Sequence, residues 1–129
     1  MRPSLLLLLA CGCAEPVAPR LSAIEQRIFA PSCTFSSCHS VMGHAGGLVL
    51  EPGKSFTSLV RQACQQDAAL QAGLVRVAPG DLARSFLIAK LREPLEPAFG
   101  PRMPQDSAPL DPTDLAAIEE WVRLGAQDD

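Results

Sequence analysis

The sequence contains no tyrosine, one tryptophan and five phenylalanines, so aromatic side chains can supply little of any core. Its 129 residues suffice for one domain and do not call for two. A domain of this length can bury a core, but this one has few large side chains with which to fill it. Either small aliphatic residues pack closely, or something other than side chains fills the space.

Basic residues are also scarce, with 11 Lys and Arg against 14 Asp and Glu. If the first ten residues are removed, ten basic residues remain and the net charge is −4. Phosphate binding needs a basic face, so we expect no nucleic-acid partner. Strand-like alternation and internal repeats are lacking, which favours an all-α class. We find no general base, nucleophile or substrate pocket, and therefore do not expect an enzyme.

The apolar run near the N-terminus predicts export. Leu5 to Ala10 follows one arginine and is too short to span a bilayer, as in a cleaved signal. Leu8-Leu9-Ala10-Cys11 resembles a bacterial lipobox, in which the cysteine becomes the acylated first residue. We predict a lipid on Cys11 that holds the protein at a membrane surface of the cell envelope, facing the periplasm or the outer surface. The alternative is a soluble secreted protein.

The remainder divides into a tether at 11–21, which contains two prolines, and a domain at 22–129. We predict a first helix with Ser22 and Glu25 as a reciprocal cap, ended by Pro31. Its apolar face carries Ile24 and Ile28, and it delivers the chain to Cys33.

Further helices are predicted at 55–69 and 81–91, the second capped by Asp81, after a glycine-rich loop at 40–54. Six prolines make 93–112 an extended loop. The last helix is the best marked, with Asp111 as cap and Pro112 in its first position. Its buried stripe and the glycine that closes it are Leu115, Ile118, Trp121, Val122 and Gly125.

The segment Cys33-Thr34-Phe35-Ser36-Ser37-Cys38-His39 carries the chemistry. Covalent haem attachment needs two thiols for the two vinyl groups and a histidine directly after the second thiol. The usual spacer has two residues and this one has four, so the extra residues would have to bulge outward. Haem would also fill the space that the missing large side chains leave.

Three other interpretations stay open. Cys33 and Cys38 could form a disulfide, as is common in exported proteins. Zinc could be held tetrahedrally by the thiols and imidazoles of Cys33, Cys38, His39, His44 and Cys64. The thiols could also be purely structural, which leaves His39 incidental.

A haem electron carrier commonly has a methionine opposite the histidine. Met42 follows His39 too closely to reach the far face of a macrocycle. Met103 lies in Gly100-Pro101-Arg102-Met103-Pro104, a rigid loop before the last helix, and is the candidate. His44 is the reserve ligand, with the same short tether as Met42.

With these residues the chain resembles a planctomycete-type cytochrome c domain, a branch of the class I cytochrome c fold, over about residues 24–126. The matching pieces are the Cys-His segment, Gly46 to Leu50, Val77 to Asp81, Ser85 to Leu87, Lys90-Leu91, Arg102 to Pro104 and the last helix. Their order and spacing together carry the resemblance.

The resemblance implies haem c bound through Cys33 and Cys38, with His39 as proximal and Met103 as distal iron ligand. It also implies that the first and last helices pack across each other at Trp121. The function it implies is that of a monohaem one-electron carrier with a periplasmic or membrane redox partner. The alternatives are a haem-free surface lipoprotein, stapled by a Cys33–Cys38 disulfide and acting as an interaction module, and a Cys/His metal-binding protein.

Three basic residues flank the predicted distal loop, namely Lys90, Arg92 and Arg102. We expect Lys90 or Arg102 to contact haem propionates or, with Arg92, an acidic partner; a solvated basic rim is the alternative. Cys13 and Cys64 are expected to be free or incidental thiols.

Overall fold

A computed structural model of the chain describes residues 14–129. The predicted signal peptide, Cys11 and Cys13 lie outside the described residues. Within them the regular structure is helical, apart from four isolated β-bridges around 60–85. No helix in this part of the chain is both long and apolar enough to cross a bilayer.

The first helical segment is continuous but changes its winding. It comprises α1 (Leu21–Ile24), a π-helical turn η1 (Glu25–Phe29) and α2 (Ala30–Ser32). Pro31 lies inside this segment, so the prediction that it ends the helix is wrong. Proline has no amide hydrogen and crowds the preceding turn, and the wide π turn directly before it accommodates that defect. The segment ends at Ser32 and delivers the chain directly to Cys33, its C-cap residue, as predicted.

The predicted cap of this helix is also wrong. Arg20 is the N-cap residue, and the amide of Ser22 donates to the carbonyl of Asp129 at the other terminus. The carboxylate of Glu25 is buried and accepts hydrogen bonds from the Gly53 amide and the Ser55 hydroxyl. Glu25 therefore ties this helix to the start of α3 (Ser55–Leu59).

The middle of the chain contains less helix than predicted. Instead of one helix over 55–69, α3 ends at Leu59 and α4 (Asp67–Gln71) follows after an irregular stretch. That stretch pairs by isolated bridges with residues near Val77, and these bridges take the place of helical hydrogen bonds. The helix predicted from Asp81 begins later, as α5 (Phe86–Leu91). Asp81 instead accepts from the Arg84 amide in the turn before it.

The two short 3₁₀ turns lie in the predicted loops, η2 (Ala45–Gly47) in the glycine-rich one and η3 (Pro97–Phe99) in the proline-rich one. The last helix is α6 (Pro112–Arg123), and its predicted start is confirmed: the Asp111 side chain accepts from the Thr113 amide. Ile118, Trp121 and Val122 are buried, as the stripe predicted.

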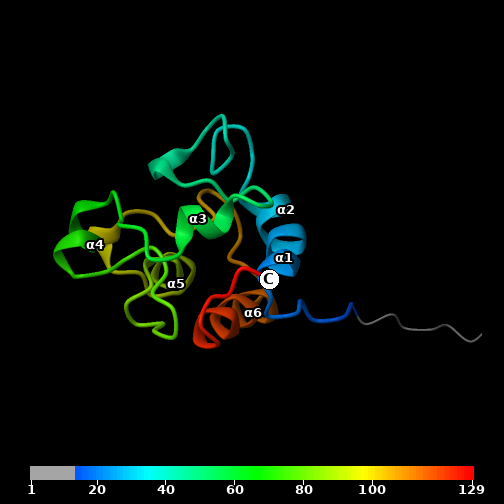
Figure 1. The fold of residues 1–129 in the computed structure, drawn as a ribbon. Coiled ribbons are helices and arrows are strands. Elements are labelled where there is room, and N and C mark those ends of the chain that lie inside the picture. Colours follow the sequence, from blue (N-terminus) through cyan, green and yellow to red (C-terminus); the bar gives the residue numbers. More distant parts are fainter. Residues whose placement is uncertain (1–13) are drawn as a thin grey trace, which may run out of the picture.

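The core lies where the two ends of the chain meet. In Figure 1 the C-terminus lies beside the start of α1, and α6 runs below it. Helices α1 and α6 are in contact, and Trp121 shares one apolar cluster with Leu21 and Ile24. Val17 is also buried in this cluster, so the packed region begins within the predicted tether.

Candidate functional site

The Cys-His segment folds back on itself. The amide of His39 donates to the carbonyl of Cys33 at 3.0 Å, and the amide of Cys38 donates to the carbonyl of Phe35 at 2.8 Å. The spacer therefore leaves the main path of the chain as a closed turn, with Phe35 60% exposed. The bulge predicted for a four-residue spacer is present, and it keeps the first thiol close to the histidine.

Gly43 makes this compact turn possible. A Cβ atom on Gly43 would lie 2.6 Å from the carbonyl oxygen of Ser36 and 2.7 Å from that of Cys38, closer than such atoms approach in proteins. The amide of Gly43 donates to the hydroxyl of Ser40, which itself donates to the Ser36 carbonyl. The absence of a side chain at this position lets the segment from 40 to 43 pack directly on the spacer.

Two adjacent cavities open beside this segment. The inner cavity has a volume of about 230 Å³, and its walls are mostly apolar, formed by residues such as Phe29, Leu48, Leu50, Leu59, Phe86 and Leu91. The outer cavity has a volume of about 400 Å³ and is bounded by Phe35, Pro31, Pro104 and Pro109. Cys33, His39, Met103 and Leu110 line both, so the two cavities meet at these residues.

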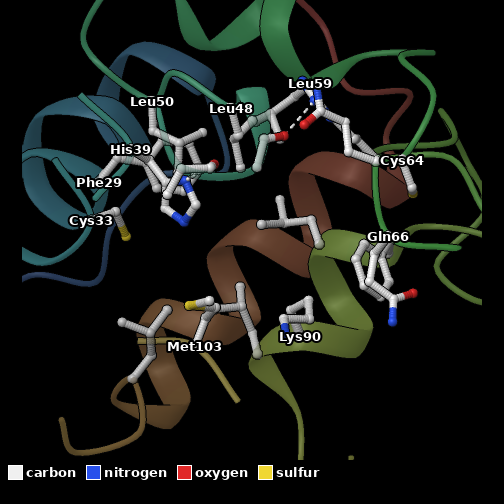
Figure 2. Close-up of a pocket in the computed structure, with 18 residues that line it drawn as sticks. Phe29, Cys33, His39, Leu48, Leu50, Leu59, Cys64, Gln66, Lys90 and Met103 are labelled. Carbon is white, nitrogen blue, oxygen red and sulfur yellow. Dashed lines mark hydrogen bonds between the residues drawn. The ribbon is translucent and has the colours of Figure 1, made fainter. Parts of the chain in front are cut away.

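The predicted ligands face each other across the inner cavity. Figure 2 shows the His39 ring on one side of the cavity and the Met103 sulfur on the opposite side, with the Cys33 sulfur at one edge. Cys38 lines only the outer cavity and not the inner one. Cys64 and Gln66 lie at the far end of the inner cavity from Cys33 (Figure 2). The tertiary structure therefore brings together all four residues predicted from the sequence.

The hydrogen bonding of His39 selects one tautomer. Its Nδ1 atom lies 3.1 Å from the carbonyl oxygen of Ala45, and because a carbonyl only accepts, Nδ1 carries the proton. Burial lowers the pKa of His39, although the hydrogen bond to Ala45 opposes that shift. The lowered pKa favours the neutral ring, and with the proton on Nδ1 the lone pair belongs to Nε2, as a metal-binding imidazole requires.

Lys90 holds the Met103 loop with both its backbone and its side chain. The amide of Met103 donates to the Lys90 carbonyl at 2.8 Å, and the Lys90 ammonium donates to the carbonyls of Phe99 and Pro101. Burial lowers the pKa of Lys90. Its Nζ atom also lies 5.8 Å from the centre of the Phe86 ring. The loop is thus fastened to the end of α5 next to the cavity.

The other predicted basic residues lie differently. Arg102 pairs with Glu93 at 2.9 Å, donates to the Ser107 carbonyl and lines neither cavity. Arg92 pairs with Glu119 on the surface. Of the predicted basic rim, only Lys90 reaches the inner cavity, and a contact between Lys90 or Arg102 and propionates remains a prediction.

The reserve ligand, His44, and the excluded methionine, Met42, both lie away from the site. His44 is exposed, lines neither cavity and has its Nδ1 atom 3.2 Å from the Val41 carbonyl oxygen. Met42 is 84% exposed. Both occupy the outside of the turn after His39, because the hydrogen bond from the His44 amide to the Ser40 carbonyl winds the chain away from the cavity.

The cysteines are separate thiols in this structure. Cys33, Cys38 and Cys64 are free, and burial raises the pKa of Cys33 to about 12, with a further contribution from Cys38. Burial also raises the pKa of Cys64, whose sulfur lies 3.7 Å from the Leu74 carbonyl oxygen. Across residues 14–129 no three His, Cys, Asp or Glu side chains form a set that could hold a metal ion. Neither the predicted disulfide nor the predicted zinc cluster is formed in these residues.

The sequence analysis did not identify Arg76, which lines the inner cavity. Its guanidinium donates to the carbonyls of Gly46, Gly47 and Ser58. No signal in the sequence marked it, since its partners lie 18 to 30 residues away along the chain.

Haem c fits the donors that this site offers. Cys33, His39 and Met103 line both the apolar inner cavity and the adjoining outer cavity, and Cys38 lines only the outer one. Comparisons with family models, with curated proteins and with solved structures find no match for this chain. The resemblance to cytochrome c domains therefore remains a prediction, and the geometry of the site is what bears on function.

Proposed function

We propose that the protein is a monohaem c-type cytochrome that carries single electrons in the cell envelope. The observation that supports this most directly is the pairing of His39 and Met103 across one apolar cavity, with Cys33 at its edge. A neutral imidazole and a thioether are the usual axial ligands of electron-transfer haems. Haem iron would supply the chemistry, cycling one electron between its ferric and ferrous states.

The chain's own part would be to bind the haem covalently and to keep its two axial ligands in fixed positions. Cys33 and Cys38 would each add a thiol across a vinyl group to form a thioether. His39 would offer its Nε2 lone pair and Met103 its sulfur. Both residues are held by hydrogen bonds to backbone carbonyls: the His39 ring by that of Ala45, and the Met103 amide by that of Lys90. Little movement would therefore accompany a change of charge, which favours fast electron transfer.

Water exclusion is the second contribution. Leu48, Leu50 and Leu59 form part of the wall of the inner cavity, and an apolar wall makes a charged iron centre less favourable than a neutral one. Cys33, Cys38 and the exposed Phe35 line the outer cavity, so the edge of a haem bound there would lie close to a docked partner. The partner would be a periplasmic or membrane redox protein, and a lipid on Cys11 would keep the domain at the membrane surface.

Covalent attachment is the decisive test. The mature chain is produced together with cytochrome c maturation proteins, and a denaturing gel is stained for haem peroxidase activity. Wild type should keep haem on the band, and the Cys33→Ala/Cys38→Ala double variant should lose it. Cys64→Ala is the matched control, because Cys64 lines the same cavity but lies outside the attachment motif. It should stain like wild type.

Intact mass gives the opposing outcomes. A wild-type mass raised by one haem supports the proposal. A colourless protein that has lost two hydrogens to a Cys33–Cys38 disulfide would contradict it and favour the interaction module. A colourless protein that retains a metal ion would favour the metal-binding alternative.

A further inference from the structure

The guanidinium of Arg76 donates all its observed hydrogen bonds to backbone carbonyls. One of its terminal nitrogens lies 2.8 Å from the Ser58 oxygen and 3.1 Å from the Gly47 oxygen. The other lies 2.9 Å from the Gly46 oxygen. Arg76 has no carboxylate partner among the ion pairs in residues 14–129. A planar fork of charged donors suits this task, since charge-assisted hydrogen bonds are about twice as strong as neutral ones.

The carbonyls that Arg76 binds belong to the turn that orients His39. Gly46 and Gly47 follow Ala45, whose carbonyl accepts from His39 Nδ1. Both glycines have positive φ angles, 63° and 65°, a conformation that L side chains rarely adopt. Two such residues in succession make a flexible turn, and the guanidinium fixes the direction of their carbonyl groups.

We propose that Arg76 is a positioning residue for His39, acting through the turn at Ala45–Gly47. This inference rests on the proposed haem site and adds to it a residue that holds the outer hydrogen bond of the proximal ligand. Such a bond raises the basicity of a metal-bound imidazole and fixes the plane of its ring. Release of the turn would let the Ala45 carbonyl rotate away, and His39 would become a weaker and less oriented ligand.

The clamp and the charge of Arg76 can be separated by two variants. Arg76→Lys keeps the positive charge but cannot reach three carbonyls with a planar fork. Arg76→Gln removes the charge as well. A less basic imidazole stabilises ferric iron less, so the reduction potential of Arg76→Lys should rise above that of wild type. Loss of a nearby positive charge lowers the reduction potential, so the potential of Arg76→Gln should lie below that of Arg76→Lys.

The matched control is Arg84→Lys, at an exposed arginine that lines neither cavity. All proteins are the full mature chain, with folding checked by circular dichroism. Two measurements are made on the haem-bearing proteins: the reduction potential, and the exchange rate of the His39 Nδ1 proton by NMR. Arg76→Lys should raise the potential and speed proton exchange, and Arg84→Lys should change neither.

A purely structural role would lower the stability of Arg76→Lys while leaving both measurements at their wild-type values, and that result overturns the inference. Failure of the proposed function looks different, because none of the proteins would then carry haem. In that case the inference about Arg76 is tested on the folded haem-free chain, by measuring the tautomer of His39 from its ¹⁵N chemical shifts. Wild type and Arg84→Lys should be protonated at Nδ1, and Arg76→Lys should show a mixture; an unchanged tautomer overturns the inference.

Discussion

The amide nitrogen of His39 lies 3.0 Å from the carbonyl oxygen of Cys33, so five intervening residues leave and rejoin the chain at one point. The longer spacer therefore does not move the backbones of Cys33 and His39 further apart in space. Phe35, Ser36 and Ser37 are all exposed, and their side chains contribute nothing to the cavity walls except at Phe35. The proposed attachment of both cysteines to one macrocycle depends on this closed turn.

Deletion of Ser36 and Ser37 should preserve the site, although it removes the Ser36 carbonyl that accepts from the Ser40 hydroxyl. It produces the two-residue spacer that attachment enzymes normally encounter, and we expect haem occupancy equal to wild type or several-fold higher when maturation is limiting. The ratio of haem to protein, measured by the pyridine haemochrome spectrum, reports the outcome. A several-fold fall in occupancy would mean that the wide turn itself is needed.

Met103→Ala should remove the distal ligand. The oxidised protein should lose its sulfur-to-iron absorption band, and its reduction potential should fall by on the order of 100 mV, a fraction of the ~0.8 V that axial ligands span. Met42→Ala is the matched control, because Met42 is 84% exposed and outside both cavities. A band that survives in Met103→Ala and disappears in Met42→Ala would reverse the assignment.

Glu25→Gln should destabilise the fold. The buried carboxylate accepts from the Gly53 amide with both oxygens and from the Ser55 hydroxyl with one of them. Glutamine would replace one of these oxygens by an NH₂ donor, which would leave a donor facing a donor in a buried position. We expect a loss of about 1–3 kcal/mol in the free energy of unfolding, measured with denaturant. The control is Glu51→Gln, whose carboxylate makes a single hydrogen bond, to the Val41 amide, near the surface. Equal losses in both variants would show that burial of Glu25 contributes nothing.

Asp111 should make stability depend on pH at the acid end. Hydrogen bonds from the Thr113 hydroxyl and then from its amide hold the pKa of Asp111 below its ordinary value of 3.8. A lowered pKa gives stability that is complete above 3.8 and is lost as the pH falls through the lower folded value.

Asp111→Ala should accordingly melt a few degrees below wild type at pH 7, with the gap narrowing as the pH falls below 3.8. Thermal unfolding between neutral and acid pH gives the comparison. Asp128→Ala, at an exposed carboxylate near the C-terminus, should show no such convergence. If the difference in melting temperature between wild type and Asp111→Ala stayed constant with pH, the charge of the cap would not be its cause.

Local signals were sufficient for some elements and insufficient for others. Helix α6 begins at Pro112 after its Asp111 cap, because both signals act within one turn of the helix. The helix predicted over 55–69 failed because bridges between Val60 and Val77 compete with it, and that pairing depends on residues far along the chain. Glu25 was assigned to the wrong partner for the same reason. The sequence offered a capping box with Ser22, but in the folded chain the Glu25 carboxylate accepts from the Ser55 hydroxyl.

The sequence by itself determined the chemistry that this protein has available: two cysteines and a histidine in one short segment, a methionine between prolines, and the well-marked last helix. Only the tertiary structure decided how these groups are held. It set His39 against the Ala45 carbonyl, fastened the Met103 loop to Lys90, and brought Arg76 to the turn that it clamps. Residue type and spacing specify which donors exist. Their direction depends on hydrogen bonds between segments that come together only when the core around Trp121 packs.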